Sequence, residues 1–241
     1  MTVLSLIGLV AAVVVLGPRV FNGLQDWDGS PPWNPECTVE TPDGEIGLTR
    51  DEAKLGTTAV ALSARGAEAP DTSELDDTVL QRLADGPESD AGPSLSCRVS
   101  PAEGLSQQEP TDSGLTPRAE QVRDQMTEVF GDLSMGGFAP GGVDHGHQED
   151  STHYDGRAID IFFRPVSEEN RREGWQLAQW LIAHADDLDI QYVIFDDLVW
   201  SAHSFGGQWH NYEVADPDNA ILRHLDHVHV DVLGGDASDG S

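Results

Sequence analysis

The sequence predicts an α+β fold, in which a small, mostly antiparallel sheet carries helices packed on one side. Helical spacing of apolar residues marks two stretches, 117–130 and 168–187. Apolar stretches of strand length lie at 157–163, 191–195, 198–200 and 227–232. The elements come in the order helix, strand, helix and then strands, which favours this fold class for residues 117–233.

The two predicted helices have recognisable ends and one apolar face each. The first begins at Thr116-Pro117, an N-cap threonine followed by proline in the first turn, and it ends at Gly131. Its apolar face carries Ala119, Val122, Met126, Val129 and Phe130. The apolar face of the second helix carries Trp175, Ala178, Leu181, Ile182 and Ala185.

The chain before residue 117 divides by composition. Residues 2–17 are apolar and uncharged, and an extension to Phe21 approaches the roughly 20 residues of a membrane span. We expect a signal anchor or signal peptide at 1–21, against the alternative of a buried core helix. The remaining expected parts are a linker at 22–35, a small cysteine-bounded accessory unit at 36–98, a second linker at 99–116 and a flexible tail at 234–241.

The accessory unit takes its limits from the two cysteines of the chain, Cys37 and Cys97. An even number of cysteines after an apolar leader favours one disulfide, with two unpaired thiols as the alternative. A hairpin is expected at 38–49, and short helices at 52–64 and 78–84. The unit has few large apolar residues, so we expect a thin core.

The charge of the chain limits its partners. There are 43 acidic residues against 13 Lys and Arg, a net charge of −30. Nucleic acids and anionic membrane surfaces would repel such a protein. We therefore expect no nucleic-acid partner, and contact with a membrane only through the N-terminal segment.

All nine histidines lie between positions 145 and 229, which indicates a metal or acid–base site in the C-terminal half. In a strand at 157–163, alternation separates Asp160 from the core-facing Ile159 and Ile161, so Asp160 is a carboxylate among apolar neighbours. A metal ion is one solution to the cost of burying it. In the last strand, alternation places His227 and His229 on one face, suited to one ligand and one catalytic base. A surface strand with incidental histidines is the alternative.

Two motifs together carry a resemblance to a known family. The pattern S-x-H-x-x-G-x-A-x-D at 151–160, followed by D-H-x-H at 226–229, resembles the LAS superfamily of zinc peptidases. This superfamily includes D-Ala-D-Ala carboxypeptidases, murein endopeptidases and hedgehog. Residues 116–233 are similar to the M15-like C-terminal domain of secreted actinobacterial wall proteins, on the stretches LTPRAEQVRDQM, HYDGRAIDIFF, GWQLAQWLIAHADDLDIQYVIF and HLDHVHV.

The resemblance implies the LAS/hedgehog-like fold and one zinc ion per chain, bound by His153, Asp160 and His229. It implies His227 as a base or transition-state stabiliser, while Asp226 stands where carboxypeptidase members place a glutamate base. Both candidates stay open, and strand alternation favours His227.

Other motif positions have less defined roles. Ser151 and Arg157 would support the ligands or orient substrate, or else form turn and strand-edge structure. Many carboxypeptidase members carry an arginine upstream of the first ligand, but residues 132–152 contain neither Lys nor Arg. His145 and His147 in this loop could bind substrate or metal, or be incidental.

The function that the resemblance implies is a zinc-dependent peptidase acting on peptidoglycan stem peptides. Its location would be extracytoplasmic, either anchored by the N-terminal segment or secreted. The alternative is a catalytically inactive zinc-containing module that binds wall peptide or a partner hydrolase.

Overall fold

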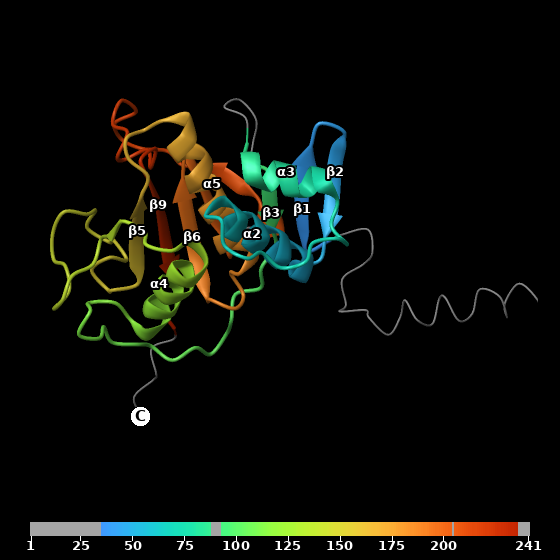
Figure 1. The fold of residues 1–241 in the computed structure, drawn as a ribbon. Helices are drawn as coiled ribbons and strands as arrows, with labels where there is room; N and C mark the ends of the chain where they lie inside the picture. The colour runs from blue at the N-terminus through green and yellow to red at the C-terminus, as the bar shows by residue number, and fades with distance from the viewer. Residues whose placement is uncertain (1–34, 88–92, 204, 236–241) are drawn as a thin grey trace, which may run out of the picture. The chain divides into compact units, whose positions relative to one another are not determined.

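The computed structural model describes residues 35–87, 93–203 and 205–235 (Figure 1). The described residues from 36 onward belong to one compact unit. The segment predicted at 1–21 and nearly all of the linker predicted at 22–35 lie outside the described residues. Within the described ranges, no helix is both long and apolar enough for a membrane crossing.

The first sheet has three strands in the order β2-β1-β3: β1 (Cys37–Thr41), β2 (Gly44–Leu48) and β3 (Leu95–Cys97). The predicted hairpin is confirmed as β1 and β2, which pair antiparallel across a turn with Gly44 at φ +123°. The helix α2 (Arg50–Ala64) follows, and a capping box of Thr49 and Glu52 fixes its start. The short helix α3 (Asp77–Asp85) begins after the N-cap Asp76.

The second sheet has six strands, and every adjacent pair is antiparallel. Its order is β4 (Met135–Gly136), β5 (Ala158–Phe162), β9 (His227–Val232), β6 (Ile190–Phe195), β7 (Leu198–Ser201) and β8 (Trp209–Asn211). Two helices, α4 (Pro117–Phe130) and α5 (Glu168–Ala183), and the 3₁₀ turn η1 (Phe205–Gly207) complete the described elements. The α+β class with antiparallel sheets is confirmed.

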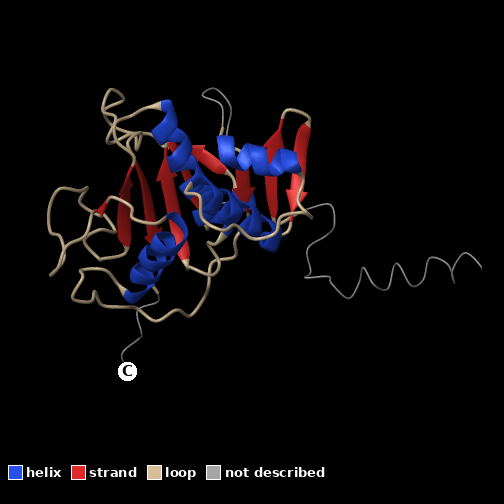
Figure 2. Ribbon diagram, viewed as in Figure 1, coloured by secondary structure: helices blue, strands red, loops and turns tan. Residues whose placement is uncertain are grey.

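The two faces of the six-stranded sheet have different chemistry. The helices α4 and α5 pack on one face, as Figure 2 shows, and contact β5, β6 and β9. The side chains on this face are fully buried and apolar, including Ile159, Ile161, Val228 and Val230. Strand alternation then places Asp160, His227 and His229 on the opposite face.

Residues 36–98 and 117–233, which the sequence separates into two parts, share one core in the structure. The thin core of the first part is completed by tryptophans of the second. The indole of Trp180 donates to Thr58 Oγ1 (3.1 Å), that of Trp200 to the carbonyl of Cys97 (3.0 Å), and that of Trp209 to the carbonyl of Leu95 (3.0 Å).

The predicted disulfide is present, and it joins Cys37 to Cys97 directly across the β1–β3 pair. The stretch 99–116, predicted as a linker, packs against the domain at its C-terminal end. Leu115 is fully buried, and the amide of Thr116 donates to the carbonyl of Gly156 (2.8 Å). The last residues of this stretch therefore belong to the packed structure.

Candidate metal centre

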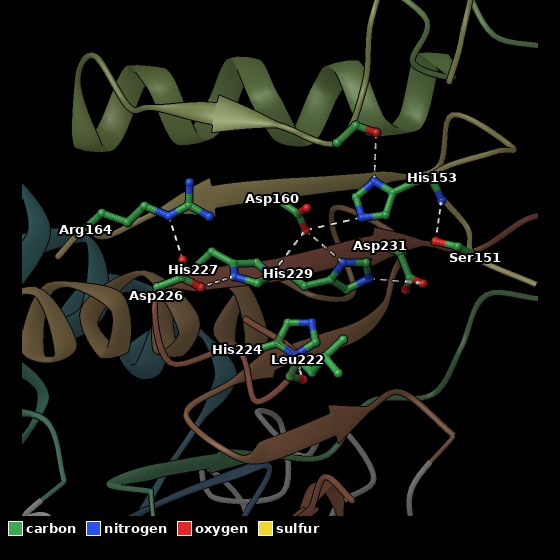
Figure 3. A network of polar contacts seen from close by, with 11 residues as sticks. Ser151, His153, Asp160, Arg164, Leu222, His224, Asp226, His227, His229 and Asp231 are labelled. Atoms are coloured by element: carbon green, nitrogen blue, oxygen red, sulfur yellow. Dashed lines mark hydrogen bonds and ion pairs between the residues drawn. The ribbon is translucent and has the colours of Figure 1, made fainter. Parts of the chain in front are cut away.

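The register between β5 and β9 assembles the site (Figure 3). Asp160 lies directly opposite His229, Phe162 opposite His227 and Ala158 opposite Asp231. Because side chains of directly opposed residues share one face, the polar residues of both strands gather on the face away from the helices. Local alternation, read from the sequence, predicts this arrangement correctly.

One carboxylate oxygen is the centre of the group. His153 Nε2 lies 3.2 Å from Asp160 Oδ1, and His229 Nδ1 lies 3.1 Å from the same oxygen. All three side chains are buried. Ligands of one tetrahedral ion, each about 2.0 Å from it, stand about 3.3 Å apart. The two spacings to Asp160 Oδ1 in this predicted set therefore suit a shared ion.

His153 is fixed by the backbone of the neighbouring β4 segment. Its Nδ1–H donates to the carbonyl of Gly137 (2.8 Å), so Nε2 is the nitrogen that faces Asp160. Gly137 has φ +80°, and a Cβ placed there would stand 2.5 Å from His153 Nδ1. Only glycine allows the backbone to approach the imidazole this closely.

His147 belongs to the group as well. Its ring stacks on that of His153, with centroids 3.9 Å apart. Tyr154 holds this part of the loop, because its hydroxyl donates to the carbonyl of His147 (2.8 Å) and accepts from its amide (3.1 Å). Donor atoms of His147, His153 and Asp160 all lie within 4.8 Å of one another, so these three residues could hold a metal ion.

This compact group differs from the predicted ligand set in one residue. It contains His147 from the loop, whereas the predicted set contains His229 from β9. His145, the other loop histidine, lies apart: its ring is exposed and pairs with Asp144. No pattern in the sequence favours one of these two loop histidines over the other.

His227 is held in one orientation by a chain of polar contacts. Its Nδ1–H donates to Asp226 Oδ1 (2.7 Å), and Asp226 Oδ2 accepts from Arg164 Nε (2.6 Å). Asp226 precedes β9, so strand alternation does not dictate its direction. Both of its oxygens are engaged, while His227 Nε2 lies 3.8 Å from Asp160 Oδ1. The geometry favours His227 as the acid–base group and Asp226 as the residue that orients it.

Arg164 is a site residue that sequence reasoning missed. It continues the alternation of Ala158, Asp160 and Phe162, two residues beyond the end of β5. Its guanidinium stands 4.1 Å above the Phe162 ring, and its side chain is 49% exposed. It is the one Lys or Arg among the described residues that line the pocket.

Ser151 and Arg157 have structural surroundings. The hydroxyl of Ser151 accepts from the amide of His153 (3.4 Å), and Ser151 lines the pocket. Arg157 instead donates to the carbonyl of Val232 (2.8 Å) and to the side chain of Gln191 (3.0 Å), and it does not line the pocket. Its contacts are those of a strand-edge residue.

The pKa values in this group are shifted because its side chains are buried close to one another. Burial alone would raise the pKa of Asp160, but the imidazoles of His153 and His229 against its Oδ1 hold it well below its ordinary value in the metal-free site. Burial alone would lower the pKa of His229, but its contacts with Asp160 and Asp231 raise it to about 9. Burial, together with the neighbouring His227 and His229, lowers the pKa of His224 to about 3.

Comparison with known proteins adds one finding. Residues 111–221 match the family model of the VldE C-terminal domain. The matched segment includes His153 and Asp160 and ends before the Asp226-His227-Val228-His229 motif. No curated protein and no solved structure matched the chain. The match does not link the chain to M15 or LAS peptidases, so that resemblance rests on the motifs.

The group lies at a cavity of about 860 Å³ on the helix-free face. The loop 146–153 lines one side, and a second segment contributes Tyr212, Ile221, Leu222 and His224. Asp160, Arg164, His227 and His229 line it as well. Imidazole nitrogens and a carboxylate oxygen are donors that bind zinc and related divalent ions. The residues present therefore fit a metal ion that a ligand in the cavity could approach.

Proposed function

We propose that this protein is a zinc-dependent peptidase that acts on peptidoglycan stem peptides at the cell envelope. The observation that carries the proposal is the convergence of His153 and His229 on one oxygen of Asp160, at a cavity with room for a peptide. Three protein ligands leave a fourth position for water or substrate, as catalytic zinc sites do.

The residues around the ligands suit hydrolysis of an amide bond. Bound zinc would polarise the scissile carbonyl and lower the pKa of a water molecule. His227, oriented by Asp226, can accept a proton through Nε2 or donate to a developing oxyanion. Arg164 can pair with a carboxylate of the substrate, while Tyr212, Ile221 and Leu222 offer contacts to its apolar parts.

The choice of substrate and location rests on other evidence. The motifs resemble those of wall peptidases, and stem peptides are rich in amide bonds and carboxylates. The disulfide is typical of proteins exported from the cytoplasm. The net charge of −30 opposes nucleic acid as an alternative ligand.

His147 favours a second candidate function. If it joined His153, Asp160 and His229, four protein donors would close the coordination sphere, which is the arrangement of structural zinc sites. The protein would then be an inactive zinc-containing module that binds wall peptide or a partner hydrolase. His147 lies on a loop, so its ligation can be tested without changing the strands.

The experiment compares the purified full chain with three variants, His229→Ala, His227→Ala and His147→Ala, and with His203→Ala as a control outside the pocket. Zinc content and the release of new termini from peptidoglycan are measured for each. We expect zinc loss in His229→Ala, and zinc retention with activity loss in His227→Ala. An inactive wild type together with an active His147→Ala variant would support the inactive module, in which four protein donors close the coordination sphere. Zinc-loaded wild type without cleavage of any wall peptide, with or without His147, would exclude the peptidase.

A further inference from the structure

A neutral imidazole carries one proton, and the group that accepts a hydrogen bond from the ring determines which ring nitrogen is unprotonated. In His153 the Nδ1–H donates to the carbonyl of Gly137, and in His224 to the carbonyl of Leu222 (2.9 Å). In His227 the acceptor is Asp226. In all three residues Nδ1 carries the proton and Nε2 is available.

His229 has the reverse orientation. Its Nδ1 faces Asp160 Oδ1 at 3.1 Å, so Nδ1 is the nitrogen available to a metal ion. Its proton then belongs on Nε2, and the group that faces Nε2 is Asp231, whose Oδ2 lies 3.9 Å away. Figure 3 shows His229 between the two carboxylates.

No contact described above accounts for the burial of the Asp231 carboxylate. Its side chain is 2% exposed, and its Oδ1 has no hydrogen-bond partner among the described residues. It lies within β9, opposite Ala158, and does not line the cavity. A carboxylate buried in the middle of a sheet is costly unless a donor or a cation satisfies it. His229 is the neighbour that can do so.

We propose that Asp231 is a positioning residue of the metal centre, which accepts the Nε2–H of His229 and so holds Nδ1 unprotonated toward the ligand position beside Asp160. The inference rests on the proposed function, because it requires a metal ion at this site. Histidine ligands commonly donate their second N–H to a carboxylate, which fixes the ring and raises its basicity. The present separation is about an ångström longer than a hydrogen bond, and such contacts often tighten when the site is loaded.

The experiment uses the full chain with Asp231→Asn, Asp231→Ala and the control Ser94→Ala. Ser94 is a matched control because its hydroxyl is likewise buried without a partner, on a segment outside the cavity. Zinc affinity is measured by competition with a chelator. Unfolding of the metal-free chain by urea is measured beside it, and ¹⁵N NMR of the zinc-loaded chain reports which nitrogen of His229 carries the proton.

We expect both Asp231 variants to bind zinc about 10- to 100-fold more weakly than wild type. The asparagine variant has the same shape and should keep the metal-free urea midpoint, and Ser94→Ala should keep wild-type affinity. The zinc-loaded wild type should carry the His229 proton on Nε2.

Three results would overturn the inference in distinguishable ways. Wild type that binds no zinc would remove the proposed function along with it. Wild type that binds zinc, with unchanged affinity in both Asp231 variants, would remove only the role of Asp231. An affinity loss in Asp231→Ala that Asp231→Asn fully restores would show that the negative charge of Asp231 is dispensable, so that the carboxylate does not set the orientation and basicity of His229.

Discussion

Asp160 and His229 face each other directly across the β5–β9 pair, with His229 Nδ1 3.1 Å from Asp160 Oδ1. Two strands far apart in sequence thus present a carboxylate and an imidazole to one point. The separation is set by strand pairing, which the helices on the other face support through a buried apolar layer. The position of these two side chains relative to each other is therefore set by the folded sheet.

The first prediction concerns metal-linked stability. Zinc at about 100 times its dissociation constant should stabilise the wild-type chain by about 2.7 kcal/mol, because it binds only the folded state. Asp160→Asn should gain nothing, since the charged ligand is gone. Thermal unfolding with zinc and with a chelator measures this, and Asp43→Asn in the β1–β2 turn is the control. An equal gain in Asp160→Asn would contradict the assignment of Asp160 as a ligand.

The second prediction concerns Gly137 and its contact with His153. Both Gly137 and Gly141 have positive φ, but only at Gly137 would a Cβ collide with the imidazole. Gly141→Ala should cost about 1–2 kcal/mol of backbone strain and leave zinc affinity unchanged. Gly137→Ala should also displace His153 and weaken zinc binding by about tenfold or more. Equal affinities in the two variants, measured by chelator competition, would show that the imidazole tolerates displacement.

The orientation of Asp160, His227 and His229 is predictable from the sequence, because strand alternation is a local property of the backbone. Arg164 lies on the same alternating series but beyond the apolar residues that identify the strand, so it was missed. The role of His147 depends on how a glycine-rich loop folds back over His153, and no periodicity encodes that. The helices α4 and α5 and the strands β5, β6, β7 and β9 are confirmed for the same local reason, whereas β4 and β8 were not predicted.

The shared core could not be predicted, because it depends on contacts between distant segments. A sequence pattern counts Trp180, Trp200 and Trp209 simply as apolar residues. In the structure their indole N–H groups donate to Thr58, Cys97 and Leu95, respectively. The strand β8 lies in a polar stretch and has only three residues, which pair with β7. No apolar pattern identifies it as a strand. Long-range packing thus joins parts that composition separates.

The third prediction follows from this shared core. Replacing both Cys37 and Cys97 with alanine should lower the free energy of unfolding by about 4 kcal/mol, as expected for a bridge that spans 60 residues. Because residues 36–98 and 117–233 pack together, the variant should unfold in a single transition. Urea unfolding followed by tryptophan fluorescence and by far-UV circular dichroism should give coincident curves. Two separate transitions would show that residues 36–98 unfold independently.

The fourth prediction concerns the pH dependence of stability near the start of α4. The hydroxyls of Ser113 and Thr111 each donate to Glu120 Oε1 (2.7 Å), which holds the pKa of this carboxyl below its ordinary value of 4.5. The unfolded chain therefore binds a proton at higher pH than the folded chain does. The stabilisation is complete above the unfolded pKa and disappears as the pH falls through the lowered folded pKa.

Glu120→Gln should consequently be less stable than wild type near neutral pH, and the difference should shrink as the pH falls below about 4.5. Urea unfolding at a series of pH values measures both chains. Glu128→Gln on the same helix is the control, because the carboxylate of Glu128 accepts no hydrogen bond within the described part of the chain. A difference between wild type and Glu120→Gln that is constant across the acidic range would mean that the hydroxyl contacts do not distinguish the ionised carboxyl from the neutral one.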